Sequence, residues 1–275
     1  MTLRYETRGM VAYLTIDNPA QLNALTIEDN ARMGELLREF RDDDERLVLI
    51  LTGSGDRAFC TGLDLKRGNP TLRNMTPIQA WQMTQGPGFG GGLTRNLELY
   101  KPVIAAINGY AVGGGHELAL ACDIRVMADH ALVGHPELQY AVLPIDGGTQ
   151  RLPRTVPLCQ AMEIILTGKM VDAHEALRIG LVNRVVPQEQ LMATCEELAA
   201  RICRLSPSTV MAAKRAILES FNRPLREGLI FESSLGGLIA QQPNFTEGST
   251  AFAEKRPARF EPDMSFHKLL ENAGR

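Results

Sequence analysis

The chain has 275 residues, of which 44% are apolar and 22% charged, with a formal net charge of -3 and a pI near 6.0. This composition is typical of a globular protein that buries a sizeable core, and it excludes a disordered chain and a strongly basic, polyanion-binding surface. No apolar run reaches the roughly 18 residues of a membrane span, and the first residues contain no apolar signal core. The five cysteines form no C-x-x-C pair and no His/Cys cluster with metal-ligand spacing, so we expect a reduced, soluble cytoplasmic protein without a metal site.

The first part of the chain predicts two strands separated by a capped helix. Residues 11–16 alternate in polarity and residues 47–52 form a short apolar run, which are two patterns typical of strands. Between them, Thr26 followed by Asp29 predicts a capping box at the start of a helix. We expect this helix to end near Arg41.

Residues 66–94 form the least regular stretch, which contains several glycines and the single tryptophan. Long irregular loops in compact domains are often functional or mobile. A lid that faces the substrate and a disordered insertion are both compatible with this pattern.

Further along the chain, residues 102–108 and 124–128 again predict buried strands. The glycine-rich turn 109–115 lies between them, and a helix begins at His116. The repeated order of strand, turn and helix predicts an α/β architecture with crossover connections.

From Met192 onward, strand patterns disappear. Helical patterns occupy residues 192–204, 208–221 and 224–241. We therefore divide the chain into a core, residues 1–190, and a helical C-terminal part, residues 191–275.

Two turns, residues 58–66 and 108–118, each follow a buried strand. A glycine turn at the start of a helix leaves backbone N–H groups unpaired, and two such groups from separate turns can converge on one oxygen as an oxyanion hole. The glycines at 113–115 also fit a simpler purpose, a tight turn with close helix packing. They lack the G-x-G-x-x-G spacing of a dinucleotide site, which disfavours a Rossmann dehydrogenase.

Two glutamates in apolar surroundings sharpen this hypothesis. Glu117 lies in the first turn of the predicted apolar helix, and Glu137 follows twenty residues later. Each alone is compatible with an exposed or ion-paired side chain. Two carboxylates in one dry cleft would have altered pKa values and could divide the acid and base roles that the addition of water requires.

At these residues the chain resembles the enoyl-CoA hydratase/isomerase (crotonase) family. The matching segments are residues 59–65, 108–117, 136–137, 147–153, 161–168, 173–183 and 251–256. They are highly specific in combination and span nearly the whole chain. The resemblance implies an α/β fold in which a spiral of ββα units, the core that binds acyl-CoA, is followed by a helical region for trimerisation and active-site cover.

The resemblance also implies the chemistry of the site. Family members bind acyl-CoA thioesters and stabilise an enolate, and the oxyanion donors at the matching positions are the N–H groups of Leu63 and Gly114. Hydratase members carry two glutamates at the positions of Glu117 and Glu137. Glu117 would hold and activate water and Glu137 would exchange the proton at the α-carbon, although the two roles could be swapped.

The resemblance further implies a set of substrate contacts. These residues are Asn23, Ala24, Ala58, Gly62, Asp64, Leu65, Lys66, Gly113, His116, Phe252 and Lys255. Lys66 would lie near the CoA phosphates, while Phe252 and Lys255 would reach CoA and the acyl chain across a subunit boundary. Both lysines are equally compatible with plain surface charge.

Three residues depart from the usual family pattern. His116 and His135 stand beside the two glutamates, either as structural side chains or as groups that tune a pKa. Asp146 replaces a residue that is usually small in simple hydratases. It resembles an aspartate that serves as an extra catalytic acid or base in ring-forming and carbon–carbon-cleaving relatives, and it equally fits a hydrogen-bonded turn.

The sequence thus predicts an enoyl-CoA hydratase or dehydratase, a carbon–oxygen lyase. The alternatives are an isomerase or carbon–carbon hydrolase that uses Asp146, and a non-catalytic CoA-binding or RNA-binding paralogue. We expect a homotrimer or a dimer of trimers, no cofactor other than the coenzyme A carried by the substrate, and no nucleic-acid or membrane partner. Straight, branched and cyclic acyl groups all remain open, so a role in fatty acid metabolism is one expectation among several.

Overall fold

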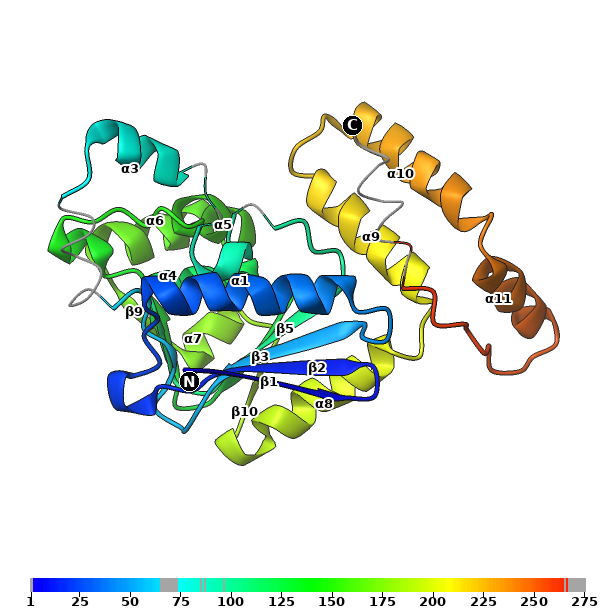
Figure 1. The fold of residues 1–275 in the computed structure, drawn as a ribbon, viewed down its shortest axis with the longest axis horizontal. Helices are drawn as coiled ribbons and strands as arrows, with labels where there is room; N and C mark the ends of the chain where they lie inside the picture. Colours follow the sequence, from blue (N-terminus) through cyan, green and yellow to red (C-terminus); the bar gives the residue numbers. More distant parts are fainter. Residues whose placement is uncertain are drawn as a thin grey trace.

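Two sheets rich in parallel strands form the core of the structure, a computed structural model that describes residues 2–64, 74–84, 86, 88–95, 97–264 and 266 (Figure 1). One sheet has the order β1-β2-β3-β5-β7-β10 and the other β4-β6-β8-β9. The strands are β1 (Leu3–Arg8), β2 (Val11–Ile16), β3 (Val48–Gly53), β4 (Ala58–Cys60), β5 (Val103–Ile107), β6 (Tyr110–Val112), β7 (Ile124–Ala128), β8 (Leu132–Gly134), β9 (Met170–Asp172) and β10 (Arg184–Val186). Only the β1–β2 and β8–β9 pairs are antiparallel among the strand pairs of the described residues.

Successive strand pairs alternate between the two sheets. In each of the pairs β3–β4, β5–β6 and β7–β8, the first strand joins the larger sheet and the second joins the smaller one. The chain therefore winds forward through both sheets, one pair at a time. This arrangement confirms the predicted α/β spiral of ββα units.

The predicted strands at 11–16, 47–52, 102–108 and 124–128 correspond to β2, β3, β5 and β7. Several of the other strands have only three residues, which is too short for the period-two pattern to be recognised. Their buried positions, such as Ala58–Cys60 in β4, come from packing between the sheets.

The helices of the core are α1 (Ile27–Asp42), α3 (Pro77–Thr84), α4 (Gly114–Ala121), α5 (Gly148–Thr155), α6 (Leu158–Thr167), α7 (Ala173–Arg178) and α8 (Leu191–Ile202). Of these, α8 packs on β3, β5 and β7 of the larger sheet, and α4 packs on β4 and β6 of the smaller one. The capping box that opens α1 is confirmed, since Thr26 accepts from the Asp29 N–H while Asp29 accepts from the Thr26 N–H. The irregular stretch contains α3 and a 3-10 turn, η2 (Gly90–Gly92), while residues 65–73, 85 and 87 lie outside the described residues.

The last helices form an arm that stands to one side of the sheets in Figure 1. They are α9 (Pro207–Glu219), α10 (Leu225–Ile239) and α11 (Pro243–Ala253). The α9–α10 pair has a small core of its own, built on Met211, Leu235 and Phe266. In contrast, α8 contributes Leu191 and Cys195 to the main core beside the larger sheet. The proposed boundary at residue 190 stays a prediction. No helix in the described ranges is long and apolar enough to cross a membrane.

Candidate active site

Three neighbouring strands of the smaller sheet deliver the main candidate residues. β4, β6 and β8 lie side by side and run parallel. Leu63 follows the end of β4, Gly114 follows β6, and Glu137 follows β8. Because the carboxyl ends of adjacent parallel strands meet at one edge of a sheet, segments that are far apart in the sequence converge there.

The two predicted oxyanion donors lie in touching turns. The Leu25 N–H donates to the Gly62 carbonyl at 2.9 Å, and the Asp64 N–H donates to the Leu25 carbonyl at 2.9 Å. Successive peptide groups of an extended strand point to opposite sides, so the N–H of Leu63 points away from Leu25. Gly114 opens α4, and the first N–H groups of a helix have no acceptor within it.

These two N–H groups are close to each other and unpaired. A Cβ atom placed on Gly62 would lie only 3.1 Å from the Gly114 nitrogen. Neither the Leu63 N–H nor the Gly114 N–H makes a hydrogen bond to any residue that the structure describes. Two free donors at one point are the arrangement that an oxyanion hole needs.

The glycines that flank Gly114 also have packing roles. Gly113 adopts φ 56°, a left-handed conformation, and a Cβ atom on it would lie 3.4 Å from Glu137 Oε1. A Cβ atom on Gly115 would lie 1.8 Å from the Cys60 carbonyl oxygen, so only glycine lets α4 approach β4 this closely. The run therefore serves close packing and leaves the oxyanion donor accessible at the same time.

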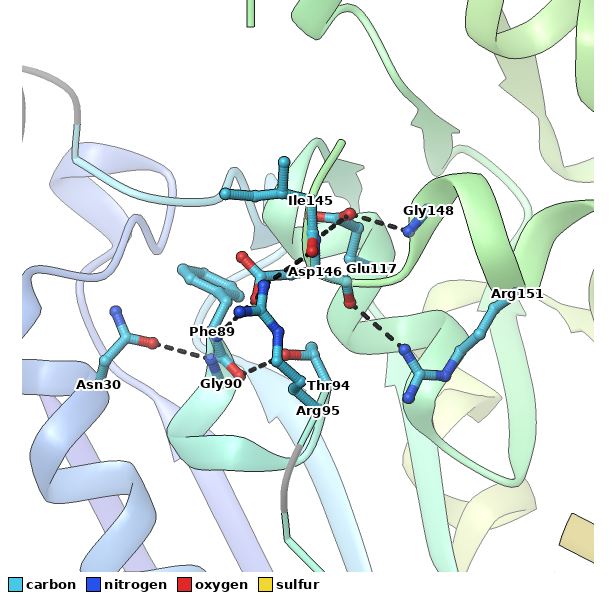
Figure 2. Close-up of polar contacts among 10 residues, drawn as sticks. All are labelled: Asn30, Phe89, Gly90, Thr94, Arg95, Glu117, Ile145, Asp146, Gly148 and Arg151. Atoms are coloured by element: carbon cyan, nitrogen blue, oxygen red, sulfur yellow. Dashed lines mark hydrogen bonds and ion pairs between the residues drawn. The ribbon is translucent and has the colours of Figure 1, made fainter. Parts of the chain in front are cut away.

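Glu117 lies in the first turn of α4 and is 3% exposed. Its Oε1 atom accepts hydrogen bonds from the N–H groups of Asp146 and Gly148, both at 2.8 Å (Figure 2). Burial raises the pKa of Glu117, and the Gly148 N–H opposes that shift. The carboxyl group is thus fixed at the N-terminus of α5 and holds a proton more readily than an exposed glutamate does.

Glu137 contacts a neighbouring histidine. Its Oε1 atom lies 3.2 Å from His135 Nδ1, and its side chain is 14% exposed. The other carboxylate oxygen, Oε2, is buried and has no hydrogen-bond partner among the described residues. An ionised carboxylate only accepts, so His135 carries its proton on Nδ1 whenever Glu137 is ionised.

The two histidines stack on each other in the interior. The rings of His116 and His135 have centroids 4.5 Å apart and an interplanar angle of 29°. Both are buried, and burial together with the neighbouring His135 ring lowers the pKa of His116 well below its ordinary value of 6.5. The neutral ring of His116 packs against His135 inside the fold, and its expected contact with the substrate stays a prediction.

Asp146 makes several contacts in the turn before α5. Its Oδ1 atom accepts from the Phe89 N–H at 3.0 Å and from Arg95 Nη2 at 3.0 Å (Figure 2). This matches the hydrogen-bonded turn that the sequence left open. A role of Asp146 as catalytic acid or base stays a prediction.

Some of the remaining predicted substrate contacts lie close to the two proposed oxyanion donors. Gly62, Asp64 and Gly113 lie around the oxyanion turns. Asn23 is fully buried, and its side chain donates to the Ala58 carbonyl at 2.6 Å, so it braces the turn before β4.

Other predicted contacts lie elsewhere or outside the described chain. Ala24 is also largely buried beside Asn23. Leu65 and Lys66 lie outside the described residues. Phe252 is 87% exposed on α11, and Lys255 follows that helix, so this chain alone does not bring them to the two glutamates (Figure 1).

Four residues at the site received no role from the sequence. Gly148 donates to Glu117, and Arg151 of α5 donates to the Asp146 carbonyl at 3.3 Å. Phe89 packs against Gly114, and Arg95 pairs with Asp146. The glycine pair at the start of α5 was a usable signal for a carboxylate-binding helix end, whereas the contacts of Phe89 depend on a loop path that no local pattern predicts.

The chain is similar in sequence and in fold to known proteins of one family. A family model described as enoyl-CoA hydratase/isomerase matches residues 6–263. The chain is 37% identical over 260 residues to (E)-benzylidenesuccinyl-CoA hydratase of Thauera aromatica, which covers 94% of this chain and 99% of the relative. It is 40% identical to carnitinyl-CoA dehydratase of Citrobacter koseri, over 93% of this chain and 96% of the relative. The crystal structure of an enoyl-CoA hydratase from Bacillus anthracis superposes with a TM-score of 0.86 at 33% identity, covering 96% of this chain and all of that one. The chain therefore belongs to the enoyl-CoA hydratase/isomerase family.

Proposed function

We propose that this protein catalyses the reversible addition of water to the 2,3 double bond of an enoyl-CoA thioester, which makes it a hydratase or dehydratase. The observation that carries the proposal is the position of two fixed carboxylates, Glu117 and Glu137, beside a pair of unpaired N–H groups. The relatives that match over nearly their full length are named hydratases or dehydratases, which supports the same type of reaction.

In the proposed mechanism, the thioester oxygen accepts hydrogen bonds from the N–H groups of Leu63 and Gly114. These donors stabilise the negative charge that develops when water attacks the β-carbon. Glu117 accepts a proton from the attacking water, and Glu137 delivers a proton to the α-carbon. The π component of the C=C bond, one O–H bond of water and the O–H bond of protonated Glu137 break, while a C–O bond, a C–H bond and an O–H bond on Glu117 form. Proton exchange with solvent returns the two carboxyl groups to their starting states, and dehydration follows the same steps in reverse.

The environment of each carboxyl group suits its proposed role. The raised pKa of Glu117 makes its carboxylate a stronger base than an exposed glutamate. The hydrogen bond to His135 occupies Oε1 of Glu137 and leaves Oε2 for proton exchange with the α-carbon. The assignment of the two roles could be reversed without moving either side chain.

The substrate is proposed only as an acyl-CoA thioester. The turn that precedes α5 exposes the apolar side chains of Tyr140, Val142, Leu143 and Ile145. These side chains suit a branched or cyclic acyl group as well as a straight one. Coenzyme A arrives with the substrate, and the proposed steps use no further cofactor.

We also propose that a second copy of the chain completes the CoA site. Phe252 lies on α11 and Lys255 follows it, and this helix lies far from α4, which carries Glu117, in Figure 1. A trimer, or a dimer of trimers, would allow a neighbouring arm to supply them.

The proposal is tested by hydration of crotonyl-CoA alongside branched and cyclic enoyl-CoAs, followed through the loss of the conjugated thioester absorbance. We expect turnover by the wild-type protein and a loss of roughly 10²–10⁴-fold in kcat for Glu117→Gln and for Glu137→Gln. Arg154→Gln, an exposed change on α5, is the control and should keep full activity.

Turnover close to normal in either glutamine variant would remove that glutamate from the mechanism. Tight binding of CoA esters without hydration of any of them would overturn the hydratase proposal. That result would favour isomerisation or carbon–carbon hydrolysis centred on Asp146.

A further inference from the structure

The segment 88–95 forms a wall behind one of the proposed oxyanion donors. Phe89 is buried, and a Cβ atom placed on Gly114 would lie 3.2 Å from Cε1 of its ring. The backbone of Gly114 therefore packs directly on the Phe89 ring. Movement of Phe89 would change the space around the Gly114 N–H, where the thioester oxygen is proposed to bind.

Asp146 connects this wall to the opposite side of the site. Its carboxylate accepts from the Phe89 N–H at 3.0 Å, and its own N–H donates to Glu117 Oε1 at 2.8 Å. A Cβ atom on Gly88 would lie 2.9 Å from Asp146 Oδ1, so the chain passes as close to the carboxylate as glycine allows. Figure 2 shows these contacts around one residue. The side chain of Asp146 thus contacts the wall of the proposed oxyanion hole, while the backbone N–H of the same residue holds the carboxylate of Glu117.

Arg95 strengthens this connection by binding two acceptors of the same turn. Its Nη2 atom donates to Asp146 Oδ1 at 3.0 Å and to the Ile145 carbonyl at 2.8 Å. The side chains of Arg95 and Asp146 are 23% and 16% exposed, so water screens the ion pair only in part. A charge-assisted hydrogen bond in such surroundings is stronger than a neutral one, and removal of Arg95 leaves the Asp146 carboxylate poorly compensated.

The segment is also attached at neighbouring points. The Gly90 N–H donates to Asn30 Oδ1 of α1 at 2.8 Å, and Thr94 Oγ1 donates to the Phe89 carbonyl at 2.7 Å. These bonds keep the segment folded on itself and against α1. The contacts of residues 88–95 with Asp146 and Ile145 link the segment to the turn that holds Glu117.

We propose that Asp146 and Arg95 are positioning residues, whose ion pair holds Phe89 against the oxyanion hole and fixes the turn that orients Glu117. This inference rests on the proposed hydratase function, because that function is what makes the oxyanion hole and Glu117 part of the reaction. It gives Asp146 a role different from that of an acid or base that exchanges protons with the substrate.

A double-mutant cycle with Asp146→Asn, Arg95→Gln and the combined variant tests the proposal. Each single change should lower kcat by roughly tenfold, and the combined variant should be no worse than either single one, because both remove the same link. Arg95→Lys, which keeps the charge, should restore part of the lost activity. Arg32→Gln removes one partner of an exposed ion pair on α1 and should leave kcat unchanged.

The cycle separates the two roles of Asp146. If the carboxylate exchanges protons with the substrate, Asp146→Asn should lower kcat by roughly 10²–10⁴-fold while Arg95→Gln has a much smaller effect. That result, or strict additivity of the two changes in log kcat, would overturn the positioning role.

The pH profile gives a second measure that a purely structural role would not change. The charged or titratable groups that act on Glu117 are Asp146 in the turn, Arg151 on α5 and His135 after β8. The negative charge of Asp146 raises the pKa of Glu117, so Asp146→Asn should move the acidic limb of kcat/KM to lower pH. A limb that moves to higher pH, or disappears, would contradict the proposal.

Hydrogen–deuterium exchange of residues 88–95 tests the link without any substrate. The amide of Phe89 should exchange roughly tenfold faster in Asp146→Asn and in Arg95→Gln than in the wild-type protein or in Arg32→Gln. Unchanged exchange in both variants would overturn the link even if the enzyme hydrates enoyl-CoA. Faster exchange in a protein that hydrates no enoyl-CoA would support the link and reject only the proposed function.

Discussion

At the scale of single residues, the proposed catalytic group of Glu117 is held at a cost to the stability of the fold. Its carboxyl group is buried and accepts two backbone hydrogen bonds, yet burial remains the larger influence and raises its pKa. The folded protein therefore binds a proton at Glu117 more tightly than the unfolded chain does. This preference contributes stability below the ordinary pKa of 4.5, and the contribution is lost as the pH rises through the raised value.

We therefore expect Glu117→Gln to be more stable than the wild-type protein at neutral pH, although we also expect it to have lost most of its activity. The amide is neutral at every pH, and its oxygen can still accept from the Asp146 and Gly148 N–H groups. Urea unfolding near pH 7.5 and near pH 4.5 should show a larger unfolding free energy for the variant at the higher pH and a smaller difference at the lower pH.

The control for this prediction is Glu35→Gln, which changes the net charge equally at an exposed site. It should leave the pH dependence of stability unchanged. A Glu117→Gln protein that is less stable than wild type at both pH values would show that the charge of the carboxylate stabilises its hydrogen bonds more than burial opposes it.

At the scale of secondary-structure elements, the N-terminus of α5 determines where Glu117 lies. Gly148 opens this helix, and its N–H donates to the glutamate. A Cβ atom on Gly148 would lie 2.7 Å from His135 Cε1 and 3.1 Å from Glu117 Oε1. This glycine thus permits the helix end, the histidine and the carboxylate to meet.

We expect Gly148→Ala to lower kcat by at least about tenfold, because the added methyl group displaces His135 or Glu117 and small errors in catalytic geometry are expensive. Its matched control is Gly228→Ala in α10, where an added Cβ atom meets nothing within 4 Å. That change should leave kcat intact and raise the unfolding free energy by roughly 0.5–1 kcal/mol. Equal kcat in the two variants would show that the contact at Gly148 does not position the catalytic groups.

The same scale shows what the sequence could predict. Apolar runs and the Thr26 cap predicted β2, β3, β5, β7 and α1, because each pattern is local. The family resemblance predicted the spiral, which local patterns do not encode. Glu117 and Glu137 were recognised as candidates by their apolar neighbours and by position.

Other parts of the site depend on contacts that cannot be predicted from the type of residue. Phe89 is tied to Asp146 through its backbone N–H, which every residue except proline possesses. Asn23 braces Ala58 across a turn, so a residue expected beside the substrate has an internal partner. Such pairings follow from the course of the chain and can be found only in the folded structure.

At the scale of the whole molecule, the helical arm exposes many large apolar side chains. They include Ile217, Leu218, Phe221, Leu225, Leu229, Ile230, Phe245 and Phe252. Large apolar side chains exposed together in one part of a protein are typical of an interface. It agrees with the proposed assembly of the chain with further copies of itself.

We expect multi-angle light scattering to give a mass three or six times that of the 30.2 kDa chain. If a neighbouring arm completes the CoA site, specific activity should fall on dilution at the concentration where the assembly dissociates. A monomer at micromolar concentration that retains full activity would contradict both the assembly and the shared site.

The convergence of the ends of β4, β6 and β8 has a consequence for how the protein acquires activity as it folds. Leu63, Gly114 and Glu137 are separated by long stretches of chain, so these proposed catalytic groups cannot meet through local structure alone. Contacts between residues that are distant in sequence form slowly, because the entropy of closing the loops must be overcome first. During refolding, helical signal should therefore return before enzyme activity, and activity should return only when the smaller sheet has assembled.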